Sequence, residues 1–152
     1  MSEEPTPAPC AATASAGRVV IARAVLDDLL EHARVESPRE CCGLLIGRPG
    51  HVEQSVRARN RARHATRYLI EPEDHFGALR RARSAGLAVV GFYHSHPSSP
   101  PIPSAVDRER AEYPGHTYVI VFPGAPPQPP EIRAFELQED GNFRALALVP
   151  FP

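Results

Sequence analysis

Apolar side chains recur along this chain in two periods, and the change between them separates helices from strands. Residues 23–36 place apolar side chains three to four residues apart, which predicts a helix that buries one stripe. Ser37-Pro38 predicts the end of this helix, because the residue before a proline is disfavoured in the α region. Similar signals predict helices over 23–36, 71–86 and 104–112, and strands over 18–22, 41–47, 51–60, 68–70, 87–93, 116–122, 131–137 and 143–149.

The pattern also predicts which side chains of two elements are buried. Alternation in the strand over 51–60 places three side chains on one face: Val52, Val56 and Ala58. Helical spacing gives the second helix an apolar stripe that includes Phe76, Leu79 and Ala82. The run 87–93 (LAVVGFY) is apolar throughout, which is typical of a central strand.

Three helices among about seven strands, with hairpins, favour an α/β fold: a single-domain sandwich with a mixed β-sheet flanked by helices. The 152 residues suffice for one domain whose core needs neither disulfides nor a metal. Residues 1–17 are rich in Pro, Ala, Ser and Thr and are expected to form a disordered tail. The folded domain is therefore expected to span residues 18–152.

Composition and charge limit the cellular compartment in which the protein is expected and the classes of partner that it is expected to bind. A formal net charge of -1 gives no general preference for nucleic acid or membrane. Three cysteines, of which Cys41 and Cys42 are adjacent, make a poor disulfide framework, and this favours the reducing cytoplasm. The N-terminal residues lack the basic and apolar regions of a secretion signal, and the apolar runs are shorter than the roughly 20 residues that span a bilayer.

The richest chemistry follows the run 87–93, in the sequence His94-Ser95-His96. Side chains alternate between the faces of a strand, so His94 and His96 project to the same side and can share one metal ion. Asp107 lies eleven residues beyond His96, across a proline-rich loop and in the first turn of a predicted helix. Two imidazoles and a carboxylate leave a fourth tetrahedral position for water, which is typical of a catalytic zinc site.

Each part of this pattern also has an ordinary structural interpretation. A His-x-His pair on a strand is more often two polar residues than a ligand pair, and Ser104 with Asp107 also fits an N-terminal helix cap. The complete string HSHPSSPPIPSAVD, however, resembles the signature of the JAMM metalloproteases, His-x-His-Pro, six residues, Ser-x-x-Asp, at every fixed position. The context RECCGLLIG, which contains Glu40, is similar to the upstream glutamate region of that family, and the resemblance extends from about residue 18 to the end.

The resemblance implies a fold and a set of roles. It implies the JAMM/MPN fold, similar to that of cytidine deaminases, in its compact prokaryotic form. His94, His96 and Asp107 would bind Zn²⁺, Glu40 would take a proton from water, and Ser104 would donate a hydrogen bond to the developing oxyanion. It also implies hydrolysis of an amide bond after the C-terminal glycine of a small ubiquitin-like or sulfur-carrier protein that ends in Gly-Gly.

Other functions remain open at this level. A noncatalytic MPN-type scaffold and a DNA-repair-associated JAMM protein share parts of the pattern, although the scaffolds typically lose metal ligands that this chain keeps. Residues alone do not separate a cysteine-releasing peptidase from a deconjugating isopeptidase, and they leave the oligomeric state open, a homodimer included. No membrane partner is expected, and nucleic acid is disfavoured because no aromatic side chains interleave with the basic ones.

Two remaining features have alternatives of their own. The residues Arg57, Arg59, Arg61 and Arg63 alternate along VRARNRAR and would form either a solvated face or a positive strip that steers an acidic protein. Cys41 or Cys42 could serve as a nucleophile, but cysteines within an apolar strand usually behave as small core side chains.

Overall fold

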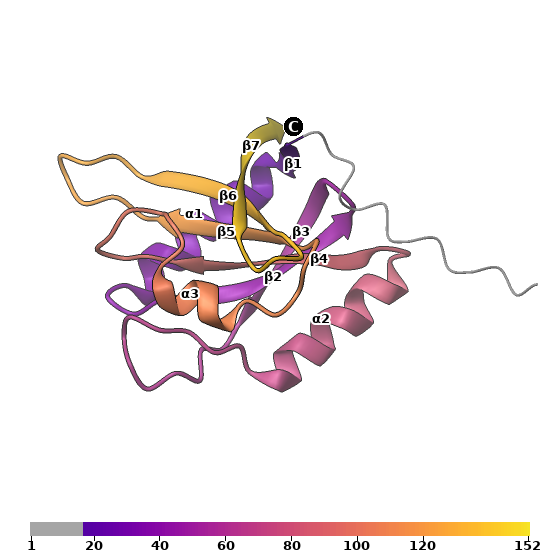
Figure 1. The fold of residues 1–152 in the computed structure, drawn as a ribbon, viewed down its shortest axis with the longest axis horizontal. Helices are drawn as coiled ribbons and strands as arrows, with labels where there is room; N and C mark the ends of the chain where they lie inside the picture. The colour runs from indigo at the N-terminus through magenta and orange to yellow at the C-terminus, as the bar shows by residue number, and fades with distance from the viewer. Residues whose placement is uncertain (1–16) are drawn as a thin grey trace, which may run out of the picture.

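The computed structural model describes residues 17–152, in which seven strands form a closed mixed β-barrel accompanied by three helices (Figure 1). The predicted α/β fold with a mixed sheet and flanking helices is confirmed, and the predicted tail lies outside the described residues except for Gly17. The elements are β1 (Arg18–Ala22), α1 (Arg23–Glu36), β2 (Cys42–Arg48), β3 (His51–Ala58), α2 (Pro72–Ser84), β4 (Ala88–Ser95), α3 (Ala105–Arg110), β5 (Thr117–Phe122), β6 (Glu131–Leu137) and β7 (Phe143–Phe151).

The strand order around the barrel is β1-β3-β2-β4-β5-β6-β7. Strand β4 lies between β2, to which it is antiparallel, and β5, to which it is parallel. A parallel pair requires a crossover connection, and the chain between β4 and β5 provides it with a proline-rich loop and α3. The carboxyl end of β4 therefore leads into the proline-rich loop that precedes α3.

Two apolar clusters occupy the two faces of the sheet. Tyr93 of β4 belongs to the cluster that α1 covers, through Val25, Leu29 and Ala33. The neighbouring Phe92 belongs to the cluster that includes Ala78 of α2. Because adjacent residues of a strand face opposite ways, His94 and His96 share the face of Phe92, on the side of α2 and α3.

The prediction that Val52, Val56 and Ala58 share one face is wrong. Val52 packs in the cluster under α1, whereas Val56 and Ala58 pack in the opposite cluster. The pairing explains this, because Gly47 opposes Val52 while the preceding Ile46 opposes Gln54. Strand β3 thus contains one extra residue at a β-bulge, and the bulge moves all later side chains to the other face.

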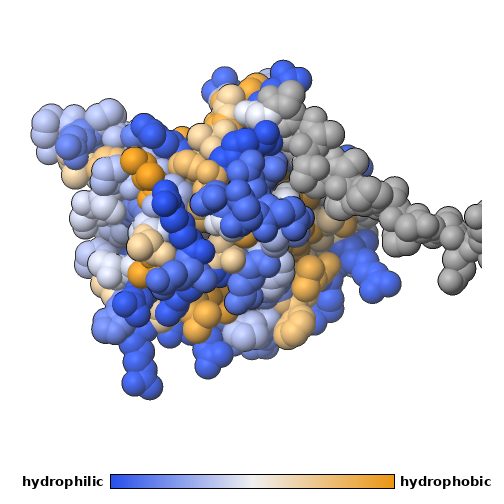
Figure 2. Space-filling model, in the orientation of Figure 1, coloured by the Kyte–Doolittle hydropathy of each residue, from blue (hydrophilic) through white to orange (hydrophobic). Residues whose placement is uncertain are grey.

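The predicted burial of α2 is also wrong in part. Ala78 and Ala82 are buried, but Phe76 is 60% exposed and Leu79 is 44% exposed. Figure 2 shows apolar surface among hydrophilic side chains in the region of α2 and α3. Small alanines, rather than the large side chains, form the contact with the sheet.

The predicted strand over 68–70 is reduced to an isolated bridge between Ile70 and Asn60. The other predicted elements exist within a few residues of their expected bounds. In the described part of the chain, no helix has the length and apolar character needed to cross a membrane.

Candidate metal centre

The carboxyl end of β4 brings the predicted ligands together. His94 and His96 project from the same face, as their spacing predicts, and their Nε2 atoms lie 3.1 Å apart. Oδ2 of Asp107 lies 3.2 Å from Nε2 of His94 and 3.1 Å from Nε2 of His96. The three donor atoms come from β4, from the residue that follows it and from α3, and they form a nearly equilateral triangle.

The first turn of α3 fixes the carboxylate of Asp107. Ser104 is the N-cap, and its Oγ accepts a hydrogen bond from the backbone N–H of Asp107. In return, the backbone N–H of Ser104 donates to Oδ2 of Asp107 over 2.9 Å. This reciprocal capping box satisfies two N–H groups at the helix start and directs the carboxylate at the two histidines.

Neighbouring groups orient both imidazole rings. Nδ1 of His96 lies 2.8 Å from the carbonyl oxygen of Pro100, and the tautomer that donates to this carbonyl leaves Nε2 free to bind a metal. The ring of Tyr68 stacks on His94 with centroids 4.4 Å apart and an interplanar angle of 20°. The rings are thus fixed by a carbonyl from the proline-rich loop and by an aromatic side chain from the segment before α2.

Glu40 reaches this place from the segment that precedes β2. Its carboxylate, His94 and His96 offer donor atoms that all lie within 4.8 Å of one another. Strand pairing brings them together, because Cys42 opposes His94 in the antiparallel pair of β2 and β4. The buried hydroxyl of Ser95 accepts a hydrogen bond of 2.8 Å from the backbone N–H of Cys41, which ties the segment of Glu40 to β4.

Burial and charge shift the ionisation of these groups. Burial raises the pKa of Glu40 to about 7, which suits a group that exchanges protons near neutral pH. Burial alone would also raise the pKa of Asp107, but its hydrogen bonds with His94 and His96 hold that pKa far below the ordinary value. Burial lowers the pKa of His94, so its imidazole is neutral and can act as a ligand.

The donor set fits a zinc ion. A tetrahedral zinc with bonds of about 2.0–2.1 Å separates its ligand atoms by roughly 3.3–3.4 Å, close to the 3.1–3.2 Å between the three donor atoms of His94, His96 and Asp107. Two nitrogens and one oxygen are donors that zinc commonly binds in catalytic sites.

Comparison with known proteins agrees with this geometry. The profile of a family described as prokaryotic homologues of the JAB domain matches residues 22–138. The chain belongs to the prokaryotic JAB (JAMM) family. With the Glu-His-His group in place, this JAB-family protein is a metallopeptidase.

Individual relatives of this JAB-family protein cover most of its length. It is 39% identical over 120 residues to the desampylase of Haloferax volcanii, which covers 72% of the chain and 84% of that relative. It is 30% identical over 105 residues to the CysO-cysteine peptidase of Mycobacterium tuberculosis, with coverage of 68% and 72%. A solution structure from Desulfitobacterium hafniense superposes with a TM-score of 0.78 and 28% identity, covering 88% of this chain and 92% of that one.

The arginine row of this JAB-family protein does not form a free positive strip. Strand β3 ends at Ala58, so only Arg57 of the row lies within it, and its guanidinium pairs with Asp28 at 2.8 Å. Arg59 pairs with Glu73 and Asp74, and Arg61 pairs with Glu71. Three of the four charges are thus balanced by acidic partners of the same chain.

The two adjacent cysteines are not activated. Burial raises the pKa of Cys41 to about 11 and that of Cys42 to about 12, so both thiols are protonated at neutral pH. A thiol without thiolate character is a poor nucleophile. Cys41 and Cys42 act as core side chains, each on a different face of the sheet.

Three residues that support the site were not singled out by the sequence pattern as part of it. Ser95 ties the segment of Glu40 to β4, and Tyr68 stacks on His94. Pro100 contributes only its backbone carbonyl to His96. Only Ser95 had a signal in the sequence. It lies between the two histidines and so faces the opposite side of the strand, and both sides of a central strand are buried.

Proposed function

We propose that this protein is a cytoplasmic zinc metallopeptidase that hydrolyses the amide bond after the C-terminal glycine of a small ubiquitin-like or sulfur-carrier protein. Zinc is held by His94, His96 and Asp107, while Glu40 and Ser104 act on the reacting atoms. Free and buried Cys41 and Cys42 support the reducing compartment.

One observation carries the proposal: three donor atoms converge within 3.1–3.2 Å of one another, with a buried carboxylate beside them. The distances of 3.1–3.2 Å favour Asp107 as the third ligand, and the buried carboxylate of Glu40 beside these atoms then remains to act as a base. A structural ion pair would need one histidine, whereas this arrangement points two imidazole nitrogens and one carboxylate at a single place.

The chain's own residues divide the remaining work. Zinc, when bound, would polarise the scissile carbonyl and lower the pKa of a water molecule. Glu40, with its pKa of about 7, takes a proton from the attacking water and returns it to the leaving amine. Oγ of Ser104 uses a lone pair to cap α3, so its O–H is available to donate to the developing oxyanion.

Two arguments support this substrate class: the names of the relatives, and the small size of a Gly-Gly end on the substrate. One relative is called a desampylase and another a CysO-cysteine peptidase. A Gly-Gly end has no Cβ atoms, so its backbone can approach a buried centre at which His94 is only 2% exposed and His96 only 6% exposed.

The test uses purified protein with one equivalent of zinc and a carrier protein that ends in Gly-Gly. Two substrates are compared: the carrier extended by a single cysteine, and the carrier joined through its last glycine to a lysine side chain. We expect the wild-type protein to release the free carrier from at least one substrate and Glu40→Gln to release none. The substrate that is cleaved faster distinguishes a peptidase from an isopeptidase. A carrier ending in Gly-Val should resist cleavage, and equal cleavage of the Gly-Gly and Gly-Val forms would contradict tail recognition.

A further inference from the structure

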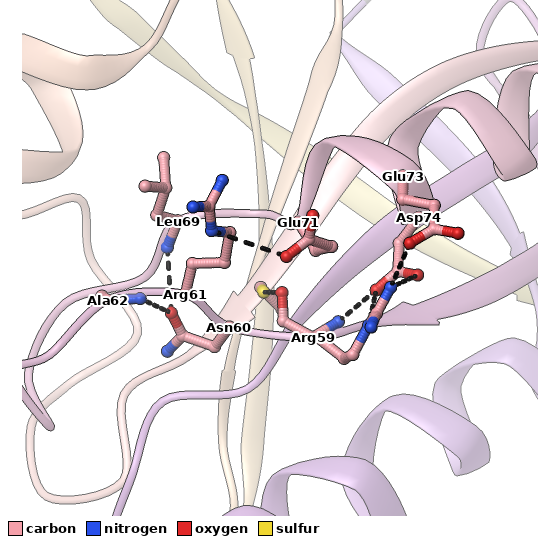
Figure 3. A network of polar contacts seen from close by, with 9 residues as sticks. Arg59, Asn60, Arg61, Ala62, Leu69, Glu71, Glu73 and Asp74 are labelled. Carbon is pink, nitrogen blue, oxygen red and sulfur yellow. Dashed lines mark hydrogen bonds and ion pairs between the residues drawn. The ribbon is translucent and has the colours of Figure 1, made fainter.

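The segment between β3 and α2 folds back on itself beside the metal centre, where its Tyr68 stacks on His94. Figure 3 shows the ion pairs and the hydrogen bonds of Asn60 that join the two halves of this segment. At its base, Arg59 pairs with Asp74, and the backbone N–H of Glu71 donates to the carbonyl of Arg59. One step further in, the N–H of Arg61 donates to the carbonyl of Leu69 over 2.8 Å. The residue between these two steps is Asn60.

Asn60 makes four hydrogen bonds with its side-chain amide, all to backbone groups. Its Nδ2 donates to the carbonyl of Glu40 over 2.9 Å and to the carbonyl of Arg67 over 3.0 Å. Its Oδ1 accepts from the N–H of Ala62 over 2.9 Å and from the N–H of Leu69 over 3.0 Å. Two carbonyls on one side and two N–H groups on the other determine the orientation of the amide and saturate it.

These four contacts connect Glu40 with the segment of Tyr68, the two features that lie beside the histidines. The backbone of Glu40 is held twice, since its carbonyl accepts from Asn60 and its N–H donates to the carbonyl of Ala65 in the folded segment. The contacts to Arg67 and Leu69 flank Tyr68, whose ring stacks on His94. A single side chain therefore sets the position of the carboxylate and of the ring relative to β4.

We propose that Asn60 is a positioning residue for amide hydrolysis, which acts by holding the backbone of Glu40 and the segment of Tyr68 in register with the metal ligands. The proposal rests on the proposed function. No other side chain supplies this pattern at this length: aspartate lacks the two donors, serine has one O–H, and glutamine is longer by one methylene. A displacement of a catalytic group by about 1 Å can lower a rate about 100-fold, so the geometry around Glu40 matters for turnover.

Asn60→Asp tests this directly, because it keeps the two acceptor contacts and places a carboxylate oxygen against the carbonyls of Glu40 and Arg67. With zinc-loaded protein and the carrier substrates, kcat should fall about 10- to 100-fold while KM changes less than about 2-fold and one zinc per chain is retained. Asn142→Asp, the same substitution in an exposed turn, is the matched control and should behave as wild type.

A double-mutant cycle separates positioning from a general loss of stability. In the Glu40→Gln background, Asn60→Asp should cause almost no further loss, because the group that Asn60 positions no longer accepts a proton. An equal further loss in that background would overturn the proposal, as would wild-type kcat or lost zinc in Asn60→Asp alone. If Asn60→Asp does not fold, Asn60→Ala carries the same expectation without the added charge.

Hydrogen exchange gives a readout that does not depend on activity. The N–H of Glu40 should exchange at least about 10-fold faster in Asn60→Asp, while the amides of β5 keep their protection. Unchanged protection of the Glu40 N–H would contradict the proposal. A wild-type protein that cleaves neither carrier substrate would instead refute the proposed function, so the two failures are distinguishable.

Discussion

Two buried histidines lie on opposite faces of the sheet and have different surroundings. His32 of α1 is 5% exposed and its Nδ1 lies 2.7 Å from the hydroxyl of Tyr93, on β4. The next residue of β4, His94, is 2% exposed and faces the other way, toward His96 and Asp107. Burial lowers the pKa of both imidazoles.

Burial and a lowered pKa therefore do not distinguish a structural histidine from a candidate ligand. The difference lies in convergence: His32 has one hydrogen-bond partner among the described residues, a neutral phenol. His94 has a second imidazole and a carboxylate within 3.2 Å of the same nitrogen. A hydrogen-bonded pair satisfies two polar groups, whereas three donor atoms around one place describe a cation site.

Removing a ligand should give the largest effect. His94→Ala and Asp107→Ala are expected to lose zinc and at least about 1,000-fold in turnover, because no activated water remains at the site. The fold should survive at room temperature, since two apolar clusters support it. Metal analysis measures the zinc content, and circular dichroism measures whether the fold is retained. His32→Ala is the matched control and should keep one zinc per chain. A zinc content below about 0.2 equivalents in the wild-type protein would refute the metal site.

Removing the base without removing a ligand gives the next effect. Glu40→Gln should bind zinc as the wild type does and lose about 100- to 10,000-fold in turnover, because an amide cannot take the proton from water. Metal content and single-turnover rates are measured on the same sample. Equal loss of zinc would make Glu40 a ligand instead of a base.

Ser104 should contribute less, because zinc shares the stabilisation of the oxyanion. Ser104→Ala should lower kcat about 10- to 100-fold with little change in KM. The same change also removes the cap of α3, which costs about 0.5–2 kcal/mol. Ser104→Gly separates the two effects, because glycine is tolerated as an N-cap and has no hydroxyl. A rise in KM alone, with kcat unchanged, would exclude the oxyanion role.

The smallest effect on the metal centre is expected on the other face. Tyr93→Phe removes the hydroxyl that pairs with His32 and should lower the free energy of unfolding by about 1–3 kcal/mol, because a buried imidazole loses its partner. Zinc content and turnover should stay at wild-type values. Denaturant unfolding measures the first quantity. A loss of zinc would show that the two faces are coupled through β4.

The local sequence pattern was sufficient to predict much of the fold and the shared face of the candidate ligands His94 and His96. The helix that ends before Pro38 and the strand that leads to His94 and His96 depend on neighbouring residues and on periods of 3.6 and two. The group of His94, His96 and Asp107 was predictable because one fourteen-residue string contains the end of β4 and the start of the crossover that follows it.

The misplaced features depend on partners distant in sequence. The alternation of β3 gives no sign of a bulge, which depends on how the strand pairs with β2 and with β1. The acidic partners of the arginine row have no local signal in the sequence, because Arg57 pairs with Asp28, which lies 29 residues away. The stripe of α2 was misjudged because hydrophobicity does not determine which side chains touch, and small alanines allow the helix to lie close to the sheet.

One oxygen atom of Asp107 serves both the start of α3 and the candidate metal centre. It accepts the N–H of Ser104 and lies beside both imidazoles. The two uses are therefore thermodynamically linked, because whatever orders the first turn of α3 also pre-pays the entropy of aligning the third ligand. The affinity of this candidate centre for a metal ion would therefore depend on the first turn of a six-residue helix as well as on the donor atoms of His94, His96 and Asp107.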